Sequence, residues 1–195
     1  MKEGKLGAVM FNLNNAAKLG TMVPPDFGGG HFGTARLPHG LIGPGIYMIV
    51  NLHTNNRYVG ISTELEKRFG SRLSVVTELG FTTAQMDKIG VYWGTVLTQD
   101  TPSAGVVATP PLWKPARCYV SPLKGTVDGE LLNLEQLLIR FTLTQIQGTI
   151  SNNIYARRHY RNPTNSTITV TLEWGPGGLF QPGRHCAFWK GGEEW

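Results

Sequence analysis

Cysteine is scarce in this sequence, and its scarcity limits the kinds of site and fold that the chain can build. Cys118 and Cys186 are the only cysteines. Two thiols far apart in the sequence make neither a four-cysteine zinc site nor the disulfide framework of a small secreted domain. We therefore expect two buried free thiols. The five histidines are scattered and form no metal-ligand pair at helical spacing, so no zinc site is predicted.

Long apolar runs are also missing. The chain has no stretch of about 18 apolar residues, which is the length that a membrane-spanning helix needs. Its opening segment, MKEGKLGAVMFNLNNAAKLG, lacks the apolar centre of a secretory signal peptide. We therefore expect no membrane partner and a cytoplasmic location. The GGGHFG segment lacks the strand-loop-helix context of a P-loop or a dinucleotide fingerprint, so we interpret it as a loop.

What the chain does contain is enough apolar material for one packed domain with elaborations. It has 195 residues, of which 41% are hydrophobic and 16% are charged, a balance typical of a globular protein. Its 25 glycines and 12 prolines predict extensive loops. The formal net charge of +5 favours a polyanionic partner only weakly, because many basic proteins bind no nucleic acid.

Periodicity and turn residues divide the chain into a few expected elements. Two β-rich runs joined by a polar turn, GIYMIV and RYVGI, predict a hairpin. The remaining expectations are an N-terminal arm with a short helix from Asn12 to Leu19, a helix over 62–80, a strand over 91–97, a long loop over 99–127, a helix over 128–147, a strand over 167–174 and an irregular tail.

The hairpin carries one tyrosine on each arm. If its turn is centred on Thr54 and Asn55, Tyr47 pairs with Ser62, and Tyr58 then lies on the same face of the sheet as Tyr47. A slip of one residue would move Tyr58 to the other face. Ordinary strand packing is one reading of these tyrosines. The other is that both phenols serve one site.

Arginines follow the hairpin on the expected 62–80 helix. Glu64, Arg68 and Arg72 recur there one turn apart, away from the centre of the apolar stripe. A solvated salt bridge between Glu64 and Arg68 is one explanation of this spacing. A guanidinium directed at a phosphate, whose geometry its planar fork matches, is the other.

Glu135 interrupts an apolar face of the expected 128–147 helix. Its neighbours three and four positions away are all apolar: Leu131, Leu132, Leu138 and Ile139. Burying a carboxylate without a partner is unfavourable, so either a buried arginine or a divalent cation should compensate it. A hard cation such as Mg²⁺ needs only one or two protein carboxylates. A phenol, an arginine and a bound cation together supply what phosphodiester hydrolysis requires.

These motifs resemble the GIY-YIG nuclease superfamily over roughly residues 43–155. Gly45-Ile46-Tyr47 matches the first motif and Tyr58-Val59-Gly60 the second. The resemblance implies that Arg68 is the catalytic arginine and that Glu135 binds one Mg²⁺ or Mn²⁺ ion. It also implies that Tyr47 activates water and that Tyr58 positions the water or the phosphate.

Two positions depart from the family pattern. Arg72 stands where a histidine or tyrosine is common, and Ile61 where some members carry lysine, so the identity of the general base is left open. Asn152 or Asn153 stands where the family often has an asparagine, and we count Asn153 with Arg72 among the substrate-binding candidates.

A basic segment, YARRHYR, follows the expected nuclease core. It interleaves arginines with aromatic residues, a composition that suits phosphate contact and stacking. A solvated basic turn is the alternative. The substrate-binding candidates of this segment are Arg157, Arg158 and Arg161.

Together these features predict an α+β fold with a small, mainly antiparallel three-stranded sheet flanked by helices. Its expected divisions are an arm over 1–42, a nuclease core over 43–155 and a β-containing extension over 156–195. The expected function is a metal-dependent endonuclease acting on DNA, double-stranded DNA being favoured. It would be a restriction-type enzyme, or a toxin acting in a target-cell cytoplasm and covered by an immunity protein. The alternative is a non-catalytic nucleic-acid-binding module on the same scaffold.

Overall fold

The part of the chain that the structure describes consists mainly of β-strands. In the computed structural model this part comprises residues 6–18, 42–70, 88–101, 112–116, 125–127, 130–146, 158–175 and 182–195. Its elements are β1 (Leu6–Lys18), β2 (Gly45–Asn51), β3 (Arg57–Ser62), α2 (Leu65–Gly70), β4 (Ile89–Asp100), β5 (Lys114–Pro115), β6 (Gly125–Val127), β7 (Glu130–Leu132), α4 (Leu134–Gln145), β8 (Ile168–Trp174) and β9 (Gly183–Trp189). No helix within these ranges is long and apolar enough to cross a membrane.

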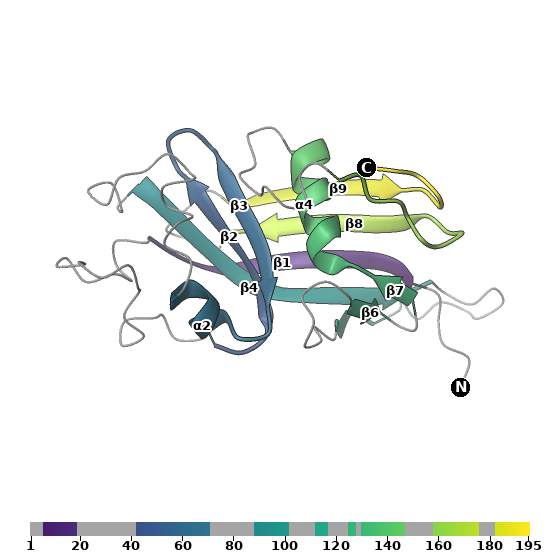
Figure 1. Cartoon of the computed structure of the whole chain (residues 1–195), viewed down its shortest axis with the longest axis horizontal. Helices are drawn as coiled ribbons and strands as arrows, with labels where there is room; N and C mark the ends of the chain where they lie inside the picture. The colour runs from purple at the N-terminus through teal and green to yellow at the C-terminus, as the bar shows by residue number, and fades with distance from the viewer. Residues whose placement is uncertain are drawn as a thin grey trace.

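Seven strands form one mixed sheet. Their order is β3-β2-β4-β1-β8-β9, and the short β5 pairs with β4 beside this path. β1 and β8 run parallel, whereas β2 pairs antiparallel with both β3 and β4. In Figure 1 the β2–β3 hairpin crosses the direction of β1, β8 and β9 steeply, as expected when right-handed twist accumulates over many strands. β6 and β7 form a separate two-stranded sheet.

The predicted small three-stranded sheet flanked by helices is therefore wrong. The three strands expected from the sequence do lie side by side as β3-β2-β4, but they make only one end of a much larger sheet. The segment expected to hold a short helix is β1, and part of the tail expected to be irregular is β9. Val9, Phe11 and Leu13 alternate along β1 and are fully buried, so period-2 burial outweighs the helix-favouring alanines beside them.

Strands from all three expected segments join this one sheet. β1 comes from residues 1–42, β2 to β4 come from 43–155, and β8 and β9 come from 156–195. β1 lies in the interior of the sheet, between β4 and β8. The β2–β3 hairpin is thus continuous, through hydrogen-bonded strands, with both flanking segments.

The helices are shorter than the sequence pattern suggested. α2 occupies the start of the helix expected over 62–80, and residues 71–80 lie outside the described part. α4 begins at Leu134, where the Asn133 side-chain oxygen accepts a hydrogen bond from the Gln136 N–H at 2.9 Å. Residues 130–132, expected to be helical, form β7 instead. The expected strand over 167–174 is confirmed as β8.

One face of the sheet carries the hydrophobic core, and α4 lies across that face (Figure 1). The hairpin residues that point into this core are Ile46, Met48 and Val50 from β2 and Val59 and Ile61 from β3. Leu137, Leu138 and Phe141 of α4 pack there as well. Because successive side chains of a strand alternate between faces, Tyr47 and Tyr58 project from the opposite face.

Candidate active site

The hairpin turn fixes the register of the two tyrosine-bearing strands. The side-chain oxygen of Asn51, which is buried, accepts hydrogen bonds from the N–H groups of His53 and Thr54, each at 2.8 Å. Asn55 adopts a left-handed conformation with φ 63°, which asparagine tolerates better than most residues. This polar turn forces one pairing of the two arms.

In that pairing Tyr47 lies opposite Gly60, and Tyr58 lies opposite Ile49. The expected partner of Tyr47, Ser62, pairs with Gly45 instead, so that prediction is wrong by two residues. A shift of two residues preserves the facing of every side chain. The two tyrosines therefore share a face, which the sequence pattern permitted but did not predict.

The two phenol rings lie against each other on this face. Their centroids are 6.2 Å apart and their planes differ by 24°. Tyr47 is only 1% exposed, whereas Tyr58 is half-buried. Gly60 makes room for the Tyr47 ring, because a Cβ at that position would lie 2.5 Å from the phenolic oxygen. The sequence signal for this requirement is the glycine of the motif Tyr58-Val59-Gly60.

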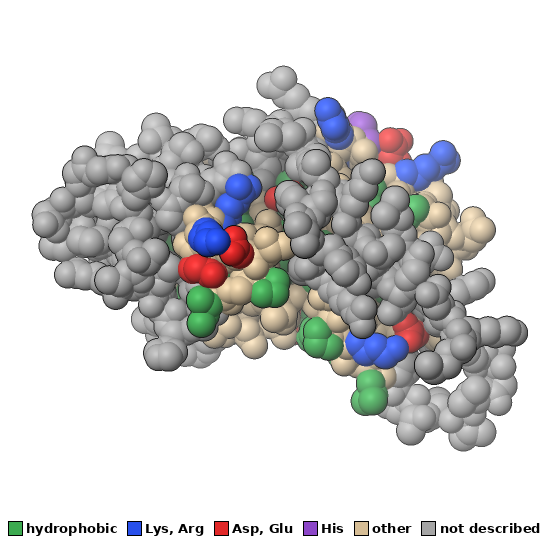
Figure 2. Space-filling model, turned by 60° about the horizontal axis from the view of Figure 1, so that its bottom comes forward, with side chains coloured by type: hydrophobic (Ala, Val, Ile, Leu, Met, Phe, Trp, Pro, Cys, Tyr) green, Lys and Arg blue, Asp and Glu red, His purple; other side chains and the backbone are tan. Residues whose placement is uncertain are grey.

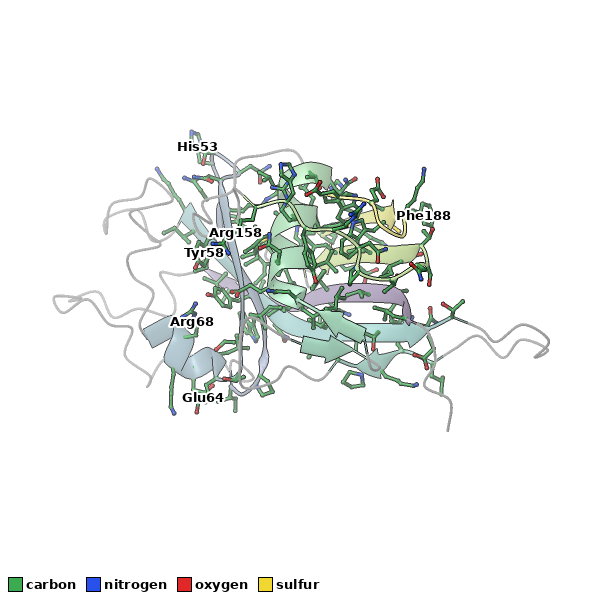
Figure 3. The ribbon with its side chains drawn as sticks, turned by 45° about the vertical axis from the view of Figure 1, so that its right-hand side comes forward. His53, Tyr58, Glu64, Arg68, Arg158 and Phe188 are labelled. Atoms are coloured by element: carbon green, nitrogen blue, oxygen red, sulfur yellow. The ribbon has the colours of Figure 1, made fainter. Side chains whose placement is uncertain are left out.

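Arg68 joins the pair from α2. Its Nε donates a hydrogen bond to the Tyr47 hydroxyl at 3.3 Å. Glu64 takes a different partner, Lys67, at 2.7 Å on the exposed side of the helix. Figure 3 shows Glu64 and Arg68 directed to different sides of the molecule. The guanidinium therefore faces the two phenols and not the solvated salt bridge that the sequence also allowed.

Charge near Arg68 favours its protonated form. Partial burial by itself would lower the pKa of Arg68, but Tyr47, Tyr58 and Glu135 together raise this pKa above its ordinary value. Glu135 is thus within electrostatic reach of the guanidinium although it belongs to a helix far along the chain. Tyr47, Tyr58 and Arg68 are therefore joined by direct contacts, and Glu135 acts on Arg68 through its charge.

Glu135 lies in the first turn of α4 and is 8% exposed, as its apolar neighbours predicted. α4 packs against β3, the strand that carries Tyr58. The positive end of the helix dipole and the charge of Arg68 both stabilise a carboxylate at this position. Among the described residues, no three His, Cys, Asp or Glu side chains are grouped so that they could hold a metal ion, so protein side chains alone would not complete the shell of a cation bound to Glu135. That arrangement fits a hard ion whose shell is completed by water and phosphate oxygens.

Of the basic segment, Arg158 lies beside the N-terminal end of α4. Its backbone carbonyl accepts a hydrogen bond from the Gln136 side chain at 3.0 Å, and its own side chain is exposed. Figure 3 shows Arg158 on the same side of the molecule as Tyr58 and Arg68. No role for Gln136 was expected from the sequence, because a glutamine next to the glutamate carries no motif of its own.

Arg161 takes a different contact. Its Nε donates to the carbonyl of Gly192 at 2.8 Å, close to the C-terminal end of the chain. The other three substrate-binding candidates, Arg72, Asn153 and Arg157, lie outside the described residues. On the face drawn in Figure 2, basic and acidic side chains of the described part are intermixed and do not form one uniform basic patch.

Comparison of the chain with models of known families, with curated proteins and with solved structures finds no match.

Proposed function

We propose that this protein is a divalent-metal-dependent endonuclease that hydrolyses phosphodiester bonds of DNA, either as a restriction-type enzyme or as a nuclease toxin. The observation that carries this proposal is the hydrogen bond from Arg68 to the Tyr47 hydroxyl beside the stacked Tyr58 ring. These three residues come from separate elements, and two of them belong to the motifs that resemble the GIY-YIG superfamily.

Hydrolysis requires a water to attack phosphorus and the bridging oxygen to leave. In the proposed mechanism the phenolic oxygens hold that water, Tyr47 in its ionised form accepts the proton of the water, and solvent protonates the leaving oxygen. Arg68 stabilises the negative charge that develops on the non-bridging phosphate oxygens. Glu135 would hold Mg²⁺ or Mn²⁺, and such an ion when bound neutralises charge on the leaving oxygen.

Burial distinguishes the two phenols. Tyr47 is almost inaccessible and is bonded to Arg68, whereas Tyr58 is half-buried. This observation favours the alternative of a non-catalytic nucleic-acid-binding module, because a general base has to reach water. The two readings differ in whether Tyr47→Phe abolishes cleavage or leaves DNA binding as the only measurable activity.

Plasmid cleavage tests the proposal directly. We expect purified protein to cut supercoiled plasmid with Mg²⁺ and not with EDTA. Glu135→Gln keeps the size of the side chain but removes its charge, and it should abolish cleavage while the circular dichroism spectrum is retained. Arg68→Ala should lower the rate by about 10² to 10³-fold, as loss of a transition-state donor does.

The neighbouring Lys67 supplies the matched control. It is exposed and paired only with Glu64 among the described contacts, so Lys67→Ala should cut at the wild-type rate. Near-native cleavage by Glu135→Gln would show that the metal assignment is wrong. DNA binding in a gel shift without cleavage by the wild type would favour the non-catalytic module, or RNA as the substrate. Discrete fragments would indicate a restriction-type enzyme, and a smear would indicate a toxin.

A further inference from the structure

Arg57 is a buried cation on the opposite face of β3 from Tyr58. It opens β3, pairs with Val50 and is only 7% exposed. Its Nη2 donates to the side-chain oxygen of Asn55 at 3.3 Å, and its guanidinium lies 5.8 Å from the centre of the Trp174 ring. Within the described ranges no carboxylate pairs with it.

These contacts leave the charge of Arg57 incompletely compensated. One long hydrogen bond to an amide and one distant ring replace only part of the hydration that a guanidinium loses on burial. Burial accordingly lowers the pKa of Arg57, and among the described residues only Tyr92 opposes this effect. An apolar side chain would pack in the same place without that penalty. An anion bound beside Arg57 accounts for a charge at this position.

A cavity of about 350 Å³ lies next to the guanidinium. This volume is at the small end of the range typical of ligand sites. Its walls combine apolar, aromatic and polar side chains: Met48, Val50, Leu52, Asn55, Arg57, Tyr92, Trp174 and Pro182. Leu52 is 40% exposed, so the cavity reaches the protein surface at the hairpin turn.

The walls of the cavity restrict the ligand further. A single cation suits one anionic group, and the planar fork of arginine matches phosphate geometry. Trp174, which also stacks on His185 with ring planes 4° apart, offers an aromatic surface to a flat ring. A phosphate joined to a flat, largely apolar ring satisfies both requirements.

We propose that this cavity binds one nucleotide, with its phosphate on Arg57 and its base against Trp174 and Met48. The nucleotide is either free or part of a nucleic-acid strand. The anion site stands on the burial of Arg57 alone, whereas the choice of a nucleotide rests on the proposed nuclease function.

Thermal unfolding and calorimetric titration test this proposal without any cleavage. The probes are deoxyadenosine monophosphate, adenosine, inorganic phosphate and a short single-stranded oligonucleotide, each in EDTA so that no hydrolysis interferes. We expect the mononucleotide to bind saturably and to raise the melting temperature, and adenosine and phosphate to bind at least about tenfold more weakly. A rise in melting temperature seen only with the oligonucleotide would show that the site binds a nucleic-acid strand and not a free nucleotide.

Two variants distinguish the contribution of Arg57 to binding from that of an arginine elsewhere on the protein. Arg57→Met should raise the melting temperature of the free protein, because it removes a buried charge, and should weaken nucleotide binding at least about tenfold. Arg184→Gln removes the same charge from an exposed side chain paired with Glu173, and it should change neither quantity. If Arg57→Met does not fold, Arg57→Lys, which keeps the charge and loses the fork, should weaken binding instead.

Several results would overturn the inference. Absence of saturable binding by every probe would remove the site, and binding that Arg57→Met retains would place it elsewhere. Phosphate binding as tight as mononucleotide binding would leave an anion site and refute the nucleotide. If the wild-type protein does not cleave plasmid but binds the mononucleotide through Arg57, the result would count against the nuclease function and not against this cavity. Cleavage without such binding would count only against this cavity.

Discussion

At the scale of single residues, Gly60 determines where the Tyr47 ring can lie. A Cβ at this position would meet the phenolic oxygen at 2.5 Å and the ring carbon that bears it at 2.6 Å. Gly60→Ala should therefore displace the ring and disturb its hydrogen bond with Arg68. We expect the cleavage rate to fall about 10²-fold, the size of effect that a misplacement of about 1 Å produces. The plasmid assay measures this rate.

A double-mutant cycle provides the control for Gly60. Arg68→Ala removes the donor that contacts Tyr47 but should leave a measurable rate, so Gly60→Ala should cost little more activity in that background. Full additivity of the two losses would mean that Gly60 acts on something other than this hydrogen bond. A wild-type rate for Gly60→Ala would show that Tyr47 can move without consequence.

Tyr92 predicts a pH dependence of stability. Burial raises the pKa of Tyr92 to about 12, and the nearby charge of Arg57 offsets only part of this effect. In the unfolded chain the phenol ionises near pH 10, so above that pH the unfolded state loses its proton first and gains stability relative to the fold. The contribution of Tyr92 is therefore complete below pH 10 and is lost between pH 10 and 12.

Tyr92→Phe removes this ionisation and should make the free energy of unfolding fall less steeply over the same interval. Urea unfolding of both proteins at about pH 9 and about pH 11 measures the difference. The lysines and the other tyrosines titrate in both proteins, so they cancel in the comparison. Parallel losses of stability would show that Tyr92 ionises in the folded state as readily as in the unfolded state.

At the scale of elements, the N-terminus of α4 positions Glu135. The Asn133 side chain caps the helix, and the Asn133 N–H donates to the Tyr160 hydroxyl at 2.6 Å. Asn133→Ala removes the cap and should lower the free energy of unfolding by about 1 kcal/mol. Asn133→Asp keeps an acceptor oxygen and should retain most of the stabilisation that the cap provides. Urea unfolding measures both effects, and equal losses in the two variants would contradict the capping role.

The sequence predicted elements whose signals are local, and it failed where packing decides. β2, β3 and β4 follow from β-rich runs and a polar turn, and α4 follows from its apolar face. A short helix was expected from Asn12 to Leu19, but pairing with β4 and β8 makes this segment part of the strand β1. The number of strands in the sheet is therefore determined by tertiary packing and not by local sequence signals.

The same distinction between local signals and tertiary packing applies to the residues of the candidate site. The spacing of Tyr47 and Tyr58 permitted a shared face, but the register that places both phenols there is known only from the observed strand pairing. The direction of Arg68 toward Tyr47, and not toward Glu64, depends on how α2 rests on the sheet, which spacing alone does not specify. Arg57 shows the same limit, since its burial depends on Trp174, a residue contributed by a strand distant in sequence.

At the scale of the whole molecule, the continuous sheet couples the hairpin to the C-terminal strands. Trp189 of β9 is fully buried and packs against Tyr160 and Trp195, with ring centroids 5.3 and 5.4 Å away. The sheet runs from β9 through β8, β1 and β4 to the hairpin without interruption. We therefore expect the described strands to unfold as one cooperative unit and not as a core with a detachable extension.

Trp189→Ala tests this cooperativity, because it damages the sheet at the end opposite to the hairpin. It should lower the free energy of unfolding by about 3 to 5 kcal/mol, and the amides of β2 and β3 should lose hydrogen-exchange protection by the same free energy. Phe188→Ala, at an adjacent side chain that is 68% exposed, should change stability by less than about 0.5 kcal/mol. Unchanged protection of the hairpin in Trp189→Ala would mean that β9 opens alone. In that case residues 43–155 would hold the site without support from the C-terminal strands.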